Sequence, residues 1–250
     1  MNLGVAIKIV PDDQDIQIAS DGNLDFSKAK PVVSSYDLNA LEAAVQIAAD
    51  GDAKVTGITV GPASIDDSKT KKNVLARGID NLIMVASDDC AQLDARATAA
   101  VLAQVVKDAA FDVVLCGDGS ADNYAQQVDV QLAAQLGWPV VNAACEISIA
   151  GGSATVKRLL EDVVETVEVP LPAVISVLPD IAQPRIPGMK DILAAGKKPM
   201  EMREVGDVPA ASLQVVSCVA PEQAERACNV MEASADGAIE QFAAALKAAL

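Results

Sequence analysis

Short apolar runs alternate with amphipathic segments through the first half of the chain. The runs are rich in Val, Ile and Leu, which is typical of parallel strands buried on both faces. They cover residues 3–10, 55–60, 82–85 and 111–116. Apolar residues at helical spacing between them predict helices. These are expected over about 38–48, 66–77, 94–109 and 122–136. Such alternation indicates an α/β fold with a doubly wound, mostly parallel sheet.

The pattern changes after Pro139. Residues 140–149 and 154–160 flank an Ala-Gly-Gly-Ser turn and predict an antiparallel hairpin. Further elements expected from the pattern are an edge strand over 163–169, a buried strand over 173–178, a short helix over 189–195, a strand-like run over 213–219 and a helix over 239–250. The last fifty residues lack a core pattern of their own. We therefore expect an α/β domain over 1–196 and an extended C-terminal arm over 197–250 that packs on another chain.

Composition and charge restrict the possible partners. The 250 residues include 35 acidic and 19 basic side chains, for a net charge of −16, which argues against binding to nucleic acid or to an anionic membrane surface. No apolar run approaches the roughly 18 residues that a membrane-spanning helix needs. The N-terminus enters a predicted strand without a signal-peptide pattern, and the five cysteines form no C-x-x-C pair. We expect a cytoplasmic protein without membrane insertion.

The chain contains no histidine. This excludes Ser-His and Cys-His catalysis and every histidine-based metal site. Asp12, Asp13 and Asp15 resemble half of a metal site, but a solvated loop is the better interpretation. We therefore expect neither a catalytic residue nor a metal ligand.

The loop over 117–122 (Gly-Asp-Gly-Ser-Ala-Asp) is the best candidate binding site. It follows a predicted buried strand and precedes a predicted helix, and its glycines let backbone N–H groups approach a phosphate closely. The loop is neither a G-x-G-x-x-G motif nor a Walker A motif. A phosphate site and an ordinary strand-to-helix connection both remain open. Lys8, expected inside the first strand, either reaches solvent or contributes positive charge to the same crevice.

Basic residues gather in one segment of this acidic chain. They are Arg185, Lys190, Lys197, Lys198 and Arg203, and Pro184, Pro187 and Met189 lie among them. A solvated segment is one interpretation. A docking surface for an acidic partner, with Met189 as an apolar anchor, is the better one.

Several motifs in this order and spacing resemble the β subunit of electron transfer flavoproteins, specifically its FixA-type branch. The resemblance covers about residues 3–200. The matching stretches are Val5–Lys8, Ser35–Ala43, Thr59–Pro62, Val74–Gly78, Leu115–Asp122, Ala125–Val128, Leu136–Pro139, Val156–Arg158, Leu171–Val174, Gln183–Arg185 and Gly196–Pro199.

The resemblance implies an adenine-nucleotide α-hydrolase-like, Rossmann-like fold and a heterodimer with an FAD-bearing α subunit. The complex would pass electrons between a flavin dehydrogenase or acyl-CoA-type reductase and an acceptor, and the β subunit itself would hold AMP or a second FAD. By position, the nucleotide-binding residues would be Ala6, Ser34, Ser35, Tyr36, Asp37, Val60, Gly117, Asp118, Gly119, Ser120, Ala121, Asp122, Asn123, Gln126, Gln127 and Val128. The residues that dock the partner would be Pro184, Arg185, Met189 and Lys190. Tyr36 takes the place of an aromatic residue near the α-subunit flavin.

Two departures from the family pattern affect the expected nucleotide. Ser34-Ser35 replaces the usual Asn-Pro, so one polar contact to the nucleotide is expected to differ. Asn123-Tyr124-Ala125 replaces the Gly-Asp-Thr of electron-bifurcating members, and this second departure favours AMP over FAD. Two other functions use the same fold. An adenylating enzyme needs a Ser/Gly-rich phosphate loop after the first strand, where this chain has Pro11-Asp12-Asp13. A nucleotide-sensing stress protein would need neither the basic loop nor the long tail.

Overall fold

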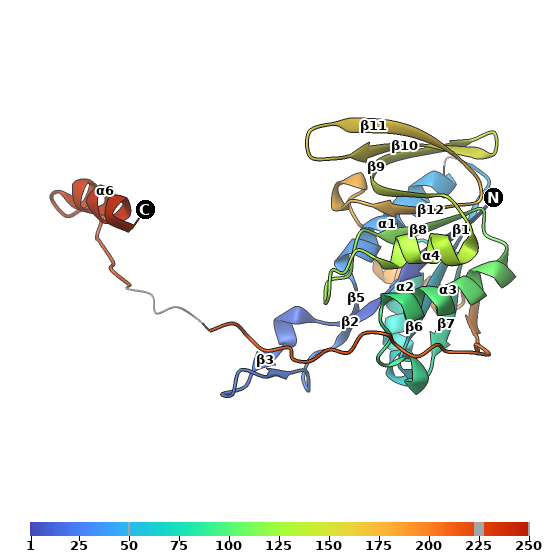
Figure 1. Ribbon diagram of the computed structural model, residues 1–250, viewed down its shortest axis with the longest axis horizontal. Coiled ribbons are helices and arrows are strands. Elements are labelled where there is room, and N and C mark those ends of the chain that lie inside the picture. Colours follow the sequence, from blue (N-terminus) through green and yellow to red (C-terminus); the bar gives the residue numbers. More distant parts are fainter. Residues whose placement is uncertain (50, 223–227, 250) are drawn as a thin grey trace.

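The computed structural model describes residues 1–49, 51–222 and 228–249. Within these residues the largest element is one mixed sheet (Figure 1). Its strands lie in the order β11 (Val164–Pro170), β10 (Ser153–Leu159), β9 (Val140–Ala150), β12 (Ala173–Val177), β8 (Val113–Gly117), β1 (Asn2–Ile7), β6 (Lys54–Gly61), β7 (Asn81–Ala86) and β13 (Met200–Met202). All neighbours from β9 to β13 pair in parallel, whereas β10 pairs antiparallel with β9 and β11. The predicted α/β fold and hairpin are confirmed.

Helices and short strands complete the fold. The helices are α1 (Ser35–Ala49), α2 (Ser68–Leu75), α3 (Ala95–Ala109), α4 (Val128–Leu136), α5 (Met189–Ala195) and α6 (Ala238–Ala249), with single 3₁₀ turns at Asp13–Asp15, Ala63–Ile65, Asp88–Cys90 and Pro179–Ile181. Two small sheets pair β2 (Ile9–Pro11) with β5 (Pro31–Val33) and β3 (Gln17–Ile18) with β4 (Leu24–Asp25). No helix in the described part of the chain is long and apolar enough to cross a membrane.

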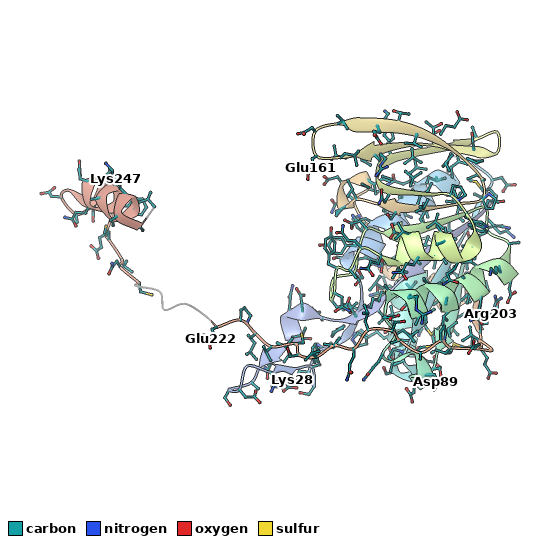
Figure 2. The ribbon with its side chains drawn as sticks, viewed as in Figure 1. Lys28, Asp89, Glu161, Arg203, Glu222 and Lys247 are labelled. Carbon is teal, nitrogen blue, oxygen red and sulfur yellow. The ribbon has the colours of Figure 1, made fainter. Side chains whose placement is uncertain are left out.

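The C-terminal helix α6 stands apart from the sheet (Figures 1 and 2). Ala238 is its one buried residue, whereas Ile239, Phe242 and Leu246 are exposed. The expected helix over 239–250 is therefore present, although Leu250 lies outside the described residues.

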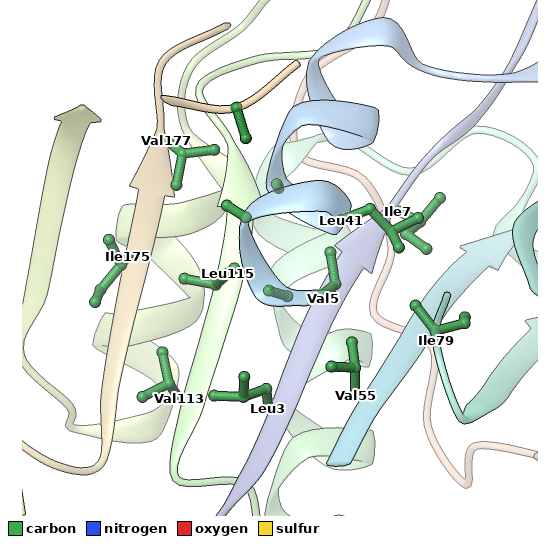
Figure 3. Packing of buried hydrophobic residues seen from close by; sticks show 14 of the residues in the cluster. Leu3, Val5, Ile7, Leu41, Val55, Ile79, Val113, Leu115, Ile175 and Val177 are labelled. Atoms are coloured by element: carbon green, nitrogen blue, oxygen red, sulfur yellow. The ribbon is translucent and has the colours of Figure 1, made fainter. Parts of the chain in front are cut away.

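The core has two layers, one on each face of the sheet, because successive side chains of a strand point to opposite faces. Leu3, Val5 and Leu115 pack on one face, where α1 contributes Leu41 (Figure 3). The alternate residues of the same strands pack on the other face beneath α3 and α4. This arrangement is the doubly wound architecture, and it leaves the carboxyl ends of the strands for loops and ligands.

The helix expected over 122–136 begins only at Val128. Tyr124 and Gln126 have φ angles of +44° and +54°, which a right-handed helix cannot accommodate. Lys8 was expected inside the first strand, but β1 ends at Ile7. Both corrections enlarge the loops at the carboxyl edge of the sheet.

The segment after residue 196 also differs from expectation. β13 pairs with β7 as the outermost strand of the sheet, and the Asp94 carboxylate at the start of α3 accepts backbone N–H groups of Ser212 and Leu213 at 2.5 and 3.1 Å. The strand expected over 213–219 does not form, apart from one bridge between Val219 and Asn23. The chain thus stays in contact with the α/β domain as far as Ala220, whose N–H donates to the Gly22 carbonyl at 2.9 Å.

Candidate functional site

The candidate site lies at the carboxyl ends of β1, β6 and β8. After β1 the chain continues through α1 to β6 on one side, whereas β8 pairs with β1 on the other side. Ligands of open α/β sheets bind at such a reversal of strand order. Three predicted residues lie at or next to these ends: Ala6 on β1, Val60 on β6 and Gly117 on β8.

The N-terminus of α1 joins the same crevice. Ser34 is fully buried, its N–H donates to the Lys8 carbonyl at 3.0 Å, and its Oγ accepts the N–H of Ala121 at 3.3 Å. Ser35 begins α1. The predicted residues of α1 and of the loop after β8 are therefore in direct contact.

Asp37, in the first turn of α1, is the buried acid of the crevice. Its side chain accepts the N–H of Lys8 at 2.7 Å, and the residue is 6% exposed. Burial raises the pKa of Asp37 to about 7, against the lowering effect of the N–H groups of Lys8 and Gly117. A Cβ at Gly117 would lie 2.7 Å from the Asp37 carboxylate, so the close approach of α1 to β8 requires glycine.

Lys8 reaches into the crevice. Its ammonium group lies 2.6 Å from the Asp122 carboxylate, so the second interpretation of this residue is the one that the structure supports. Burial opposes ionisation of Asp122, but the hydrogen bonds from Lys8 and Ser120 outweigh it and lower its pKa. This ion pair ties the loop after β8 to the end of β1.

Tyr124 covers the start of the loop. Its hydroxyl donates to Asp118 Oδ2 at 2.5 Å, and this hydrogen bond, aided by burial, raises the pKa of Tyr124 to about 12. A side chain at Gly119 would collide with the Tyr124 ring. The rings of Tyr124 and Tyr36 lie 4.9 Å apart between centroids. Gly119 therefore makes room for the Tyr124 ring.

The rest of the loop presents polar groups to solvent. Residues 121–127 are all exposed, and this stretch includes Asn123, Gln126 and Gln127. The backbone N–H of Asp118 donates to Val177 at 3.2 Å, and that of Tyr124 donates to Ser120 at 2.9 Å. The side chains of Asn123, Gln126 and Gln127, together with the loop backbone, could contact a bound molecule. Val128 begins α4 directly after this stretch.

The expected docking residues divide into two groups. Arg185 is bound within the chain, since its Nε and Nη2 donate to the Glu42 carboxylate at 2.6 and 2.9 Å. Pro184 precedes it. Met189 is 73% exposed, and Lys190 is exposed as well.

Two other cations of the basic segment also have partners within the chain. The Lys198 ammonium donates to the carbonyls of Leu75 and Ile79 near the end of α2, and Arg203 pairs with Glu201. The exposed surface around residues 186–193 is therefore mainly apolar. We define the recognition loop as Ile186, Met189, Ile192 and Leu193, all exposed. Sequence reasoning missed all but Met189, although apolar residues beside Pro187 and Gly188 were a visible signal.

The described residues contain no group of three or more Cys, Asp or Glu side chains able to hold a metal ion. Comparison with protein families gives a match to the electron transfer flavoprotein domain over residues 23–208. The match includes α1, β8, the loop after it and the recognition loop. Because it spans well over half of the 250 residues, the chain belongs to the electron transfer flavoprotein domain family.

Proposed function

We propose that this chain is the β subunit of a heterodimeric electron transfer flavoprotein of the FixA-type branch. Its α subunit carries FAD, and the complex passes electrons in the cytoplasm between a flavin dehydrogenase or acyl-CoA-type reductase and an acceptor. The family match and the order of the motifs over residues 3–200 support this role. The chain itself acts as an electron carrier subunit rather than as an enzyme.

We further propose that the crevice at the ends of β1, β6 and β8 holds an adenine nucleotide. The observation that carries this proposal is that segments carrying predicted nucleotide residues meet at these strand ends. The loop after β8 is held to α1 by the Ser34–Ala121 hydrogen bond and to the end of β1 by the Lys8–Asp122 ion pair. These contacts bring three of the predicted nucleotide residues, Ser34, Ala121 and Asp122, close to the end of β1.

The residues present fit a phosphate with neutral donors. The N-terminus of α1 faces the crevice and favours negative charge there. Lys8 is the cation within reach, and Ser120 and Gln127 add a hydroxyl and an amide. A bound FAD would supply a second redox centre, whereas AMP would be redox-inactive.

Tyr124 favours AMP over FAD. Its ring lies over Gly119 and beside Tyr36, and it occupies space that an isoalloxazine extending from the crevice would need. The smaller nucleotide requires less displacement of this pair.

The apolar C-terminal arm supports a partner subunit. Leu213, Val215 and Val216 are 73%, 81% and 97% exposed, and α6 exposes Ile239 and Phe242. Contiguous exposed apolar surface marks an interaction site. We propose that residues 1–196, with the strand β13 added, form the nucleotide-binding domain, and that the remainder of the expected arm over 197–250 packs on the α subunit.

The test is the ligand content of the full-length chain co-purified with its α subunit. Acid extraction and mass spectrometry should find AMP and one FAD per heterodimer. Two FAD molecules per heterodimer would mean that the crevice holds a second FAD in place of AMP. One FAD and no other adenine compound would refute the crevice site. Failure to bind a flavin-bearing subunit would refute the β-subunit role.

A matched pair of glycine variants locates the nucleotide. Gly117→Ala places a Cβ 2.8 Å from the Tyr36 backbone and should lower the AMP content by separating α1 from β8. Gly206→Ala is the control, because no atom lies within 4 Å of its added Cβ. Both variants are compared at equal folded fraction, measured by circular dichroism. Equal AMP content in the two variants would contradict the proposed location.

A further inference from the structure

A separate pocket of about 180 Å³, partly open to solvent, lies beside the loop after β8. Its lining comes from five places in the fold: Asp118 after β8, Asp129 on α4, Ser176 on β12, Asn142 on β9 and Arg158 on β10. The antiparallel hairpin thus forms one wall and the parallel sheet another. Among the residues assigned to the nucleotide crevice, only Asp118 and Gln126 line this cavity.

Two residues of the lining carry buried polar atoms without a hydrogen-bond partner. Asp118 Oδ1 and Arg158 Nε each lack a partner within the described residues. The other groups of both side chains are engaged, since Asp118 Oδ2 accepts from Tyr124 and Arg158 Nη2 donates to Asn142 Oδ1 at 2.6 Å. Buried polar atoms in proteins are nearly always paired. One atom here is an acceptor and the other a donor, and neighbouring atoms cover both of them. A molecule in the pocket with a donor beside an acceptor would satisfy both once the two side chains turn toward it.

The charges of the lining disfavour an anion. Asp118 and Asp129 contribute two carboxylates, whereas Arg158 contributes one guanidinium group, which also lies 3.7 Å from Glu165. Asp129 accepts a 2.5 Å hydrogen bond from the Ser176 hydroxyl, so its partner is already in place. A phosphate or carboxylate would meet net negative charge in this cavity.

The size and the apolar lining of the pocket further restrict the kind of ligand that it can bind. Ala143, Leu160 and Leu178 supply apolar surface. A dry protein cavity of about 150 Å³ holds a benzene molecule, so the present volume suits a six-membered ring with one small substituent.

We propose that this cavity is a second binding site for a small uncharged molecule that carries an amide group. The amide N–H would donate to Asp118 Oδ1, and the amide carbonyl would accept from Arg158 Nε. Asp118 also holds Tyr124, so an occupant would contact the residue that anchors the cover over Gly119. The site does not depend on the nature of the nucleotide in the neighbouring crevice.

The test uses two probes of nearly equal shape, nicotinamide and nicotinate, which differ in replacing the amide by a carboxylate. Each is titrated into isotope-labelled full-length protein, with any co-purifying subunit left in place. Backbone amide shifts are followed by nuclear magnetic resonance. Nicotinamide should give saturable shifts at Ser176 and Leu178, and nicotinate should bind at least about tenfold more weakly, which corresponds to about 1.4 kcal/mol. Equal affinity for both probes, or shifts spread over the surface, would overturn the proposal.

Variants of neighbouring residues on β10 give the control. Arg158→Met keeps a long side chain but removes the donor, and it should weaken nicotinamide binding about tenfold. Lys157→Met removes an exposed ion pair with Glu146 and should leave the affinity unchanged. Asn142→Ala supplies a second test if Arg158→Met does not fold, because Asn142 lies at an exposed position. It removes the acceptor that holds the Arg158 side chain, and the nicotinamide affinity should change. Unchanged affinity in the cavity variants that fold would mean that the cavity holds water alone, and the proposal would fail.

Discussion

Replacing Arg185 with Met should destabilise the protein through Glu42. The Glu42 side chain on α1 is 8% exposed and receives two hydrogen bonds from the Arg185 guanidinium group, at 2.6 and 2.9 Å. The Arg185 N–H adds a third at 3.3 Å. Loss of the guanidinium group would leave a buried carboxylate without its cation and would remove two of the three hydrogen bonds that join Arg185 to α1.

The structure sets the expected size of the effect. Removal of one partner of a buried ion pair costs about 3–5 kcal/mol. The Arg185 side chain is 41% exposed, so water can replace part of the lost interaction, and we expect a loss of about 2–3 kcal/mol in the free energy of unfolding. For a chain of this length that corresponds to a fall of about 4–12 °C in melting temperature. The double variant with Glu42→Gln should lose less than the sum of the single variants, with a coupling energy of about 1–2 kcal/mol.

The pH dependence has a defined sign. The hydrogen bonds from Arg185 hold the pKa of Glu42 below its ordinary value of 4.5, despite partial burial. A carboxyl whose pKa is depressed in the folded state contributes stability above its unfolded pKa and loses it as the pH falls through the folded pKa. In Arg185→Met, burial without the cation raises the pKa of Glu42, and protonation of Glu42 then relieves part of the destabilisation. The difference between wild type and Arg185→Met should therefore be largest near neutral pH and shrink as the pH falls.

Urea unfolding, followed by circular dichroism across this pH range, measures these differences. Lys157→Met serves as the control, since it removes an ion pair with two exposed partners and should leave the stability nearly unchanged. A change in Arg185→Met as small as that of the control would refute the reasoning. The reasoning would also be refuted if the changes in the free energy of unfolding of the two single variants added up to that of the double variant.

Three other residues give predictions that separate fold, crevice and surface. The pKa of Asp37 is about 7 in the folded state and ordinarily 3.8, so wild-type stability should decline as pH rises through that interval, and Asp37→Asn should abolish the decline in melting temperature. Met189→Ala should weaken binding of the proposed dehydrogenase partner by about 2 kcal/mol in a titration, whereas a large loss of stability would identify Met189 as a core residue. Phe242→Ser should lower the affinity for the α subunit in sedimentation experiments without changing the melting of the isolated chain, because Phe242 is 59% exposed.

The sheet was predictable because buried parallel strands are continuous apolar runs. The runs over 55–60 and 82–85 lie within β6 and β7, which extend them by one residue at each end. Asp94 was expected to begin a helix, and its side chain caps α3 by accepting the N–H of Ala97 at 2.8 Å. Local chemistry decided these elements, so tertiary contacts did not alter them.

The loop after β8 was not predictable in the same way. Ala125, Gln126 and Gln127 favour helix, and the expected helix included them. In the fold, Asp122 bonds Lys8 and Tyr124 bonds Asp118, partners that the helical pattern did not anticipate. These contacts hold the backbone out of helical geometry, and they involve the residues that make the loop a candidate site.

The strand expected over 213–219 does not form, because this segment has no neighbouring strand to pair with among the described residues. The residues from Leu213 to Val219 have the composition of a strand, but a strand needs an edge to pair with. β13 already pairs with the edge of β7. The sequence pattern did not predict this strand, because Met200–Met202 is less apolar than the run over 213–219. The sequence also did not predict that Arg185 and Lys198 bind acceptors within the chain. Arg185 donates to Glu42, and Lys198 donates to carbonyls near the end of α2, and these acceptors are distant in sequence.

The acidic residues of the crevice need not repel a phosphate, although the chain carries a charge of −16. Asp122 faces the ammonium group of Lys8, and the Asp37 pKa of about 7 means that this carboxyl is partly protonated near neutral pH. An approaching anion would therefore meet Asp37 and Asp122 with their charge already reduced or balanced, beside the N-terminus of α1. A chain can thus keep a strongly acidic surface and still present a local site for an anion.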